Sequence, residues 1–204
     1  NPITDCLSGF DQEAMNENLV NQLIIPSYDQ LLNQLAFLED QLDIFLSAPD
    51  ADKLEAAQNQ LIKTWKSWQW AAAFEFGPAE ENFLRSSLNN FPVDTQAVNT
   101  NIQNGNWDFD MPDNYDKGFP ALDYLLFGSA ADNASIADLF ANSDAHRDYV
   151  QAVFQDMYNR TLATQTAWTD NYAATFIANA GTAAGTSLSL VVNNLNQFYE
   201  IIKR

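Results

Sequence analysis

The sequence predicts an all-α fold: an up-down helical bundle of four long helices, with short helices and an acidic loop between the second and the third. Apolar residues recur at every third or fourth position along most of the 204-residue chain, as on one face of an amphipathic helix. No useful length of sequence alternates apolar with polar residues, as a half-buried strand does. Hydrophobic residues make up 47% of the chain, which is a globular composition.

The first long helix is expected from Asp11 to Leu46, after a flexible N-terminal segment of residues 1–10. Leu23 belongs to its apolar stripe. Pro26 interrupts the stripe, because proline removes a backbone hydrogen bond and crowds the preceding turn. We therefore expect either one kinked helix or two helices that meet near Ile25.

The second long helix is expected to follow Asp50, a residue type that caps helix N-termini, and to end before Gly77 and Pro78. Trp65 and Trp68 share its apolar face, which predicts that both belong to the core. Trp70 lies off that face, so it is the better candidate for an exposed, ligand-binding aromatic side chain.

Short helices are expected over residues 78–88, 94–105, 118–128 and 135–140, and a polar, acidic loop over residues 106–117. The third long helix is expected from Asp144 to Trp168 or Tyr172, with Leu162 on its apolar stripe. The fourth follows Gly181, and its stripe includes Val192 and Leu195. Residues 11–204 are thus expected to form one bundle.

The charge balance excludes one class of partner. The chain has 27 acidic and 9 basic residues, a formal net charge of −18. Nucleic-acid binding needs a basic face, and none is visible. No apolar run reaches the length of a transmembrane helix. The abundance of Asn, Gln, Ser, Thr and Asp favours an exported protein.

Metal chemistry is limited by a single histidine, His146. A zinc site built from two or three imidazoles is excluded within this chain, so any metal site must consist mostly of oxygen ligands. Asp108, Asp110 and Asp113 supply such oxygens on the acidic loop, and Ca²⁺ is the hard cation that they suit. The loop lacks the glycine and the closing glutamate of an EF-hand, so a solvated acidic loop is the alternative.

Glu75 is a further candidate binding residue. With Glu80 and Glu81 it flanks Gly77 and Pro78, which could place carboxylates beside the start of a helix. Acidic residues in a first helical turn also complement the helix dipole, so a purely structural role is the alternative.

Four segments, in order, resemble the imelysin-like family. They are GFDQEAMNENLVNQLIIPSYDQL, FEFGPAEENFLRSSLNNFPVD, KGFPALDYLLFG and GTSLSLVVNNLNQFYEIIKR. This family comprises exported bacterial proteins that are found with iron-uptake systems and classed with an insulin-cleaving metallopeptidase. The resemblance implies that residues 11–204 are the first half of a longer, two-bundle protein. It also implies a periplasmic or outer-membrane location, with a lipid anchor outside this segment.

The signature G-x-H-x-x-E of that family is altered here. When Gly118 is aligned with its glycine, Pro120 replaces the histidine and Asp123 replaces the glutamate. One monodentate carboxylate does not hold a transition metal tightly. The chain therefore resembles a divergent subtype that has lost most of the metal and catalytic residues.

These features predict a non-catalytic binding protein that takes part in acquiring iron or another metal-bearing nutrient at the bacterial cell envelope. We expect Asp123 to lie partly buried in a cleft with Gly118 and Tyr124, and the acidic loop to form its rim. Iron, zinc or calcium could bind there, or another cationic ligand. The alternatives are a metallopeptidase, and a structural, partner-docking bundle in which Phe119, Leu122, Leu125 and Leu126 are core residues and Asp123 lies outside.

Overall fold

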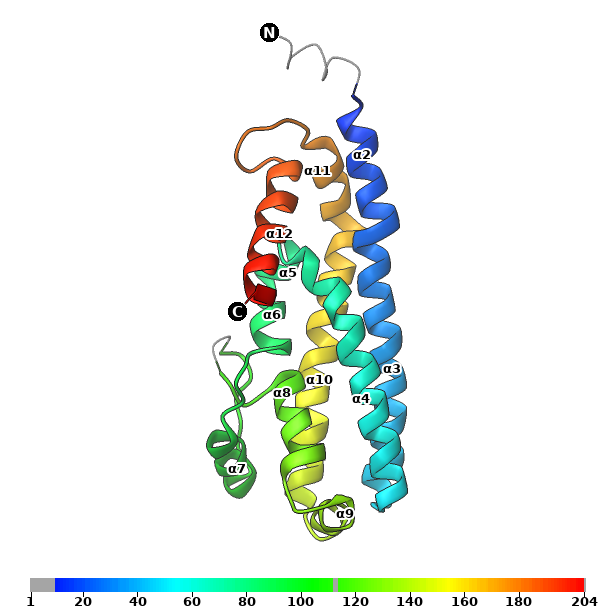
Figure 1. Ribbon diagram of the computed structural model, residues 1–204, viewed down its shortest axis with the longest axis vertical. Helices are drawn as coiled ribbons and strands as arrows, with labels where there is room; N and C mark the ends of the chain where they lie inside the picture. The colour runs from blue at the N-terminus through cyan, green and yellow to red at the C-terminus, as the bar shows by residue number, and fades with distance from the viewer. Residues whose placement is uncertain (1–9, 112–113, 204) are drawn as a thin grey trace.

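The computed structural model describes residues 10–111 and 114–203, and every regular element among them is helical. The prediction of an all-α fold is confirmed. Long helices lie side by side along the longest axis of the molecule, and the short helices gather along one side (Figure 1). Most of the expected segment 1–10 lies outside the described residues. No described helix is both long and apolar enough to cross a membrane.

The first long helix consists of α2 (Gln12–Leu19), a π-helical turn η1 (Val20–Ile24) and α3 (Ile25–Ser47). Pro26 lies in the first turn of α3, directly after η1, so the helix continues through the proline although its nitrogen has no N–H to donate. The predicted junction near Ile25 is confirmed. A π-turn accommodates the proline, and such local bulges have no simple sequence signature.

A short turn reverses the chain into α4 (Ala51–Ala71), whose N-terminus is capped by Asp50: its carboxylate accepts the Lys53 N–H at 2.8 Å. The helices α3 and α4 pack along their length. A polar contact supplements the apolar seam between them. Thr64 donates its hydroxyl proton to the carbonyl of Gln34 at 3.1 Å.

The connector after α4 is less regular than expected. It contains the 3₁₀ turn η2 (Ala72–Phe74), then α5 (Pro78–Glu81) and α6 (Leu84–Leu88) in place of one helix over 78–88. The break falls at Phe83, whose backbone is left-handed with φ of 52°. The expected helix at 94–105 is confirmed as α7 (Thr95–Asn104), with Asp94 as its N-cap.

After the acidic loop come α8 (Gly118–Asp123), the π-turn η3 (Tyr124–Gly128) and α9 (Asn133–Ala141). The third long helix consists of α10 (Asp144–Ala167), the π-turn η4 (Trp168–Tyr172) and α11 (Ala173–Ala178). Helix α10 packs on α3 and α8, whereas α11 packs on α2. The last helix, α12 (Ser187–Lys203), lies against η2 beside the upper part of the bundle (Figure 1).

The core follows the predicted stripes in most places. Fully buried side chains include Tyr28, Leu31, Leu35, Leu38, Phe45, Leu54, Trp68, Phe119, Phe140, Tyr149, Met157 and Trp168. Trp65 is half-buried and stacks on Phe119, with ring centroids 5.5 Å apart.

Four residues of the predicted stripes lie at the surface instead: Leu23, Leu162, Val192 and Leu195 are each 40–51% exposed. The reason is geometric. The apolar stripe of a helix is wider than the contact that one neighbouring helix covers, so its flanks stay in solvent.

Candidate functional site

Gly118, at the start of α8, has a structural requirement for glycine. Its φ is +74°, and a Cβ atom there would lie 2.4 Å from the carbonyl oxygen of Leu88. Any larger residue would clash with the backbone at the end of α6. The glycine therefore allows the start of α8 to pack directly against α6.

The helix that Gly118 begins presents its apolar residues to the core. Phe119, Leu122, Leu125 and Leu126 are fully buried, as predicted for one face of this segment. Pro120 is also buried. It carries no side-chain group that could bind a metal or accept a proton.

Asp123 is exposed, so the expectation that it would be partly buried at the base of a cleft is wrong. It is the exposed last residue of α8, after five buried residues, and it lines neither of the two cavities described below. Its neighbours still remove some water, and this desolvation raises the pKa of its carboxyl group. Tyr124 is half-buried and accepts a hydrogen bond from Asn99 Nδ2 at 2.9 Å, which ties η3 to α7.

The acidic loop does not gather its carboxylates around one point. Asp108 and Asp110 are exposed, and Asp108 accepts the backbone N–H of Asp110 at 2.9 Å. Asp113 lies outside the described residues. Within the described part of the chain, no three His, Cys, Asp or Glu side chains are placed to hold a metal ion.

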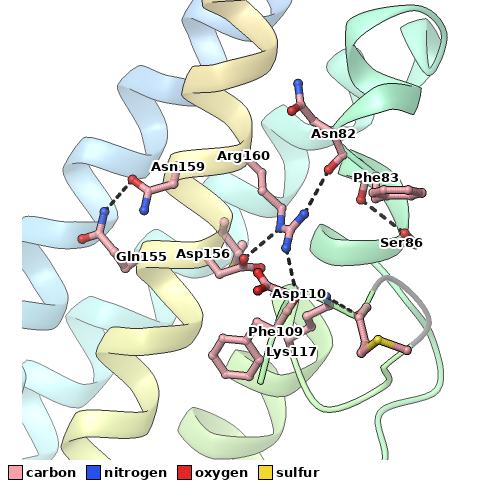
Figure 2. Close-up of polar contacts among 12 residues, drawn as sticks. Asn82, Phe83, Ser86, Phe109, Asp110, Lys117, Gln155, Asp156, Asn159 and Arg160 are labelled. Atoms are coloured by element: carbon pink, nitrogen blue, oxygen red, sulfur yellow. Dashed lines mark hydrogen bonds and ion pairs between the residues drawn. The ribbon is translucent and has the colours of Figure 1, made fainter. Parts of the chain in front are cut away.

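The loop is instead held by two cationic side chains (Figure 2). Lys117 is fully buried, and its Nζ donates to the carbonyls of Phe109 at 2.6 Å and Met111 at 2.8 Å. Arg160 of α10 donates to the same Phe109 carbonyl at 2.9 Å, and its Nε donates to Asp156 at 2.8 Å. The ammonium group of Lys117 thus contacts carbonyl oxygens of the loop, as a bound cation would.

Burial acts on both signs of charge in this cluster. It lowers the pKa of Lys117, and it raises the pKa of Asp156 against the opposing effect of Arg160. One oxygen of Asp156 and one of Asp116 are buried without a hydrogen-bond partner among the described residues. Sequence reasoning missed Lys117 because lysine is normally a solvated residue, and no pattern in the sequence distinguishes this one.

Trp70 lines an apolar groove and is 69% exposed. The prediction that it would be exposed is confirmed. The groove has a volume of about 590 Å³ and runs between η1, the N-terminus of α3, the end of α4 and α12. No charged side chain lines it: its walls are Gln22, Leu23, Pro26, Ser27, Gln30, Gln69, Trp70, Ala73, Phe74 and Phe198.

Glu75 lines a separate cavity of about 390 Å³ between the α4–α6 connector and α12. Its backbone N–H donates to the amide oxygen of Asn194 at 3.2 Å, and its carbonyl accepts from the same amide at 2.8 Å. Its carboxylate accepts the N–H of Arg85 at 2.8 Å. Desolvation raises the pKa of Glu75, although Arg85 opposes the rise.

The predicted site residues therefore fall into separate places. Gly118, Asp123 and Tyr124 lie on α8 and η3, low in Figure 1, whereas α12, beside which Trp70 and Glu75 lie, is in its upper half. Neither the groove that Trp70 lines nor the cavity that Glu75 lines includes a residue of α8 or η3.

The sequence model of the Imelysin family matches residues 24–204. The chain belongs to the imelysin family. Iron-regulated protein A of Synechococcus elongatus is 29% identical over 122 residues, which cover 60% of this chain and 33% of that protein.

A solved structure supports the fold. A crystal structure described as an iron-regulated protein A precursor from Parabacteroides distasonis superposes with a TM-score of 0.72 at 20% identity. The match covers 92% of this chain and 56% of the solved chain. The imelysin-family chain described here thus spans about half the length of that solved relative and a third of the curated one.

Proposed function

We propose that this imelysin-family chain is a non-catalytic binding module that takes part in acquiring iron or another metal-bearing nutrient at the bacterial cell envelope. The proposal rests on two positions of α8, the helix that carries the family signature. The position of the family histidine is a buried proline, Pro120, and the position of the family glutamate is an exposed aspartate, Asp123.

A metallopeptidase needs a bound metal that activates water, and a base beside it. Pro120 supplies neither a ligand nor a base. A lone exposed carboxylate such as Asp123 can contact a cation or a metal-bearing ligand, but it holds a bare transition metal weakly. The side chains of α8 can therefore contact a ligand, but they supply no tight site for a catalytic metal.

The relatives support the link to iron and to export. Both are named iron-regulated protein A, and the solved one is described as a precursor, the form in which exported proteins are made. The net charge of −18 attracts cations and cationic ligands toward the surface. The same proposal includes a location in the periplasm or outer membrane, a lipid anchor and a second bundle beyond this segment.

The test is calorimetric titration of the purified chain with Fe²⁺, Fe³⁺, Zn²⁺ and Ca²⁺. We expect no binding of Zn²⁺ or Fe²⁺ tighter than about 1 μM. We expect the weak heat that does appear to fall in Asp123→Ala, and to remain in the loop variant in which Asp108 and Asp110 are changed to asparagine.

The positive control is the double variant Pro120→His with Asp123→Glu, which restores the family signature on α8. It should bind Zn²⁺ more tightly than the natural chain. Tight, stoichiometric binding of a transition metal by the natural chain, together with cleavage of a peptide substrate, would contradict the non-catalytic proposal and favour the metallopeptidase.

A second candidate, a partner-docking bundle, is favoured by one observation. Val192, Leu195 and Tyr199 of α12 follow one another at helical spacing and are 46–61% exposed, so α12 presents a second apolar face to solvent. An absence of any ion binding, combined with self-association that Leu195→Glu abolishes, would favour this candidate over the first.

A further inference from the structure

The cavity beside α12 brings side chains of opposite charge together without pairing them. Glu75, Glu80 and Arg85 all line it, and Arg85 is half-buried. One guanidinium nitrogen of Arg85 donates to the carbonyl of Ala72 at 2.7 Å. Among the described residues, however, no carboxylate oxygen lies within 4.0 Å of that guanidinium group.

The acidic side of the cavity is also incompletely satisfied. Glu75 uses Oε1 to accept the backbone N–H of Arg85, while its Oε2 is buried and has no hydrogen-bond partner among the described residues. A charged group that is removed from water without a partner is unfavourable. The cavity therefore holds a carboxylate and a guanidinium group that each lack an ionic partner.

The rest of the lining suits a small polar molecule. Phe76 and Asn194 of the lining are buried and Leu190 is half-buried, and Asn193 and Gln197 add exposed amide groups that can donate or accept hydrogen bonds. The two-point hydrogen bond between Asn194 and the backbone of Glu75 fixes the wall that carries the carboxylate. The volume of about 390 Å³ lies within the range of small-molecule sites.

We propose that this cavity binds a small zwitterion of the α-amino-acid type, with its ammonium group beside Glu75 and Glu80 and its carboxylate on Arg85. Arginine presents a planar fork of donors that matches a carboxylate, and a primary ammonium group has three donors for carboxylate and amide oxygens. A simple cation would leave Arg85 unpaired, and a simple anion would face two carboxylates. The site is distinct from α8 and goes beyond the proposed function.

The test is calorimetric titration of the whole chain with L-alanine and L-leucine as zwitterions, ethylamine as the cation alone and propionate as the anion alone. We expect saturable binding of at least one amino acid, and binding of ethylamine and propionate weaker by about tenfold or more. Glu75→Gln and Arg85→Gln should each weaken amino-acid binding by a similar factor. Glu81→Gln is the matched control, because Glu81 is an exposed glutamate on α5, next to Glu80, and does not line the cavity.

Circular dichroism and thermal unfolding of each variant separate loss of binding from loss of structure. If Arg85→Gln does not fold, Asn193→Ala at the rim takes its place, with a smaller expected loss of affinity. The proposal is overturned if neither amino acid gives saturable heat, if ethylamine binds as tightly as the amino acids, or if Glu75→Gln binds them unchanged. None of these results bears on the ion titrations of Asp123, so the two proposals fail independently.

Discussion

At the scale of single residues, the sequence predicts side chains well where one face of a helix decides the outcome. Trp68 is buried and Trp70 is exposed, as their positions on the helix predict. The exposure of Asp123 could not be predicted, because helical phase alone does not show whether another element covers a residue. The burial of Lys117 could not be predicted either, because only the tertiary structure places carbonyl oxygens around its ammonium group.

Glu75 is the residue whose ionisation should matter most for stability. Burial raises its folded pKa above the ordinary value of a glutamate, so the folded chain binds more protons than the unfolded chain across the interval between the two pKa values. Stability contributed by the protonated form is therefore lost as pH rises through that interval. We expect Glu75→Gln to be more stable than the natural chain at pH 7 and to lack this pH-dependent loss.

The measurement for Glu75 is urea unfolding at several values between pH 4 and pH 8. Glu81→Gln is the control, because Glu81 is an exposed glutamate on the neighbouring helix α5. A natural chain whose stability increases with pH across this interval relative to Glu75→Gln would show that the carboxylate is favourably paired. It would also remove the support that an unpaired Glu75 gives to a ligand in the cavity.

At the scale of secondary-structure elements, helix ends and turns carry most of the predictable information. Asp50 caps the helix that it is expected to cap, and Asp94 at the predicted start of α7 does the same. The π-turn η1 and the break at Phe83 had no such signal, because both depend on how the flanking helices meet. The acidic loop was correctly placed, but its organisation depends on Arg160, which lies on α10, far along the chain from the loop.

Lys117 should therefore be a determinant of the structure of this loop. Lys117→Met keeps the apolar stem but removes the donor to the carbonyls of Phe109 and Met111. An unsatisfied buried polar group costs about 1–3 kcal/mol, so we expect a loss of about 2–4 kcal/mol in the free energy of unfolding. Hydrogen exchange should increase over residues 106–117 before it increases in α3 or α4.

Lys63→Met is the matched control for Lys117→Met, since Lys63 is an exposed lysine on α4. It should change the free energy of unfolding by about 0.5 kcal/mol or less. Equal effects of the two substitutions would mean that the buried ammonium group contributes nothing specific to the loop. Binding of Ca²⁺ gained by Lys117→Met alone would support the view that the ammonium group takes the place of a cation.

At the scale of the whole molecule, the fold is predictable from the periodicity of the apolar residues, whereas the site is not. The bundle depends on apolar stripes that recur along whole helices, so a few exposed positions such as Leu23 and Val192 do not alter it. A site depends on single side chains from segments far apart in sequence. Glu75 and Asn194, for example, are joined across 119 positions by hydrogen bonds that no local pattern encodes.

The net charge of −18 makes a prediction that belongs to the molecule as a whole. Only four ion pairs join described residues, so most of the 27 acidic side chains repel one another across the surface. This repulsion opposes the compact state. Salt screens it, since the Debye length falls from about 30 Å at 0.01 M to about 3 Å at 1 M.

We therefore expect the Tm to rise by several degrees between about 10 mM and 0.5 M NaCl, a range over which the screening length falls steeply. The variant with Asp108 and Asp110 changed to asparagine has two fewer negative charges, so it should begin with a higher Tm at low salt and gain less from added NaCl. A Tm that falls with salt would mean that the few ion pairs, such as Arg160 with Asp156, outweigh the repulsion. Because both of those side chains are mostly buried and hence weakly screened, we expect the repulsive surface to dominate the response.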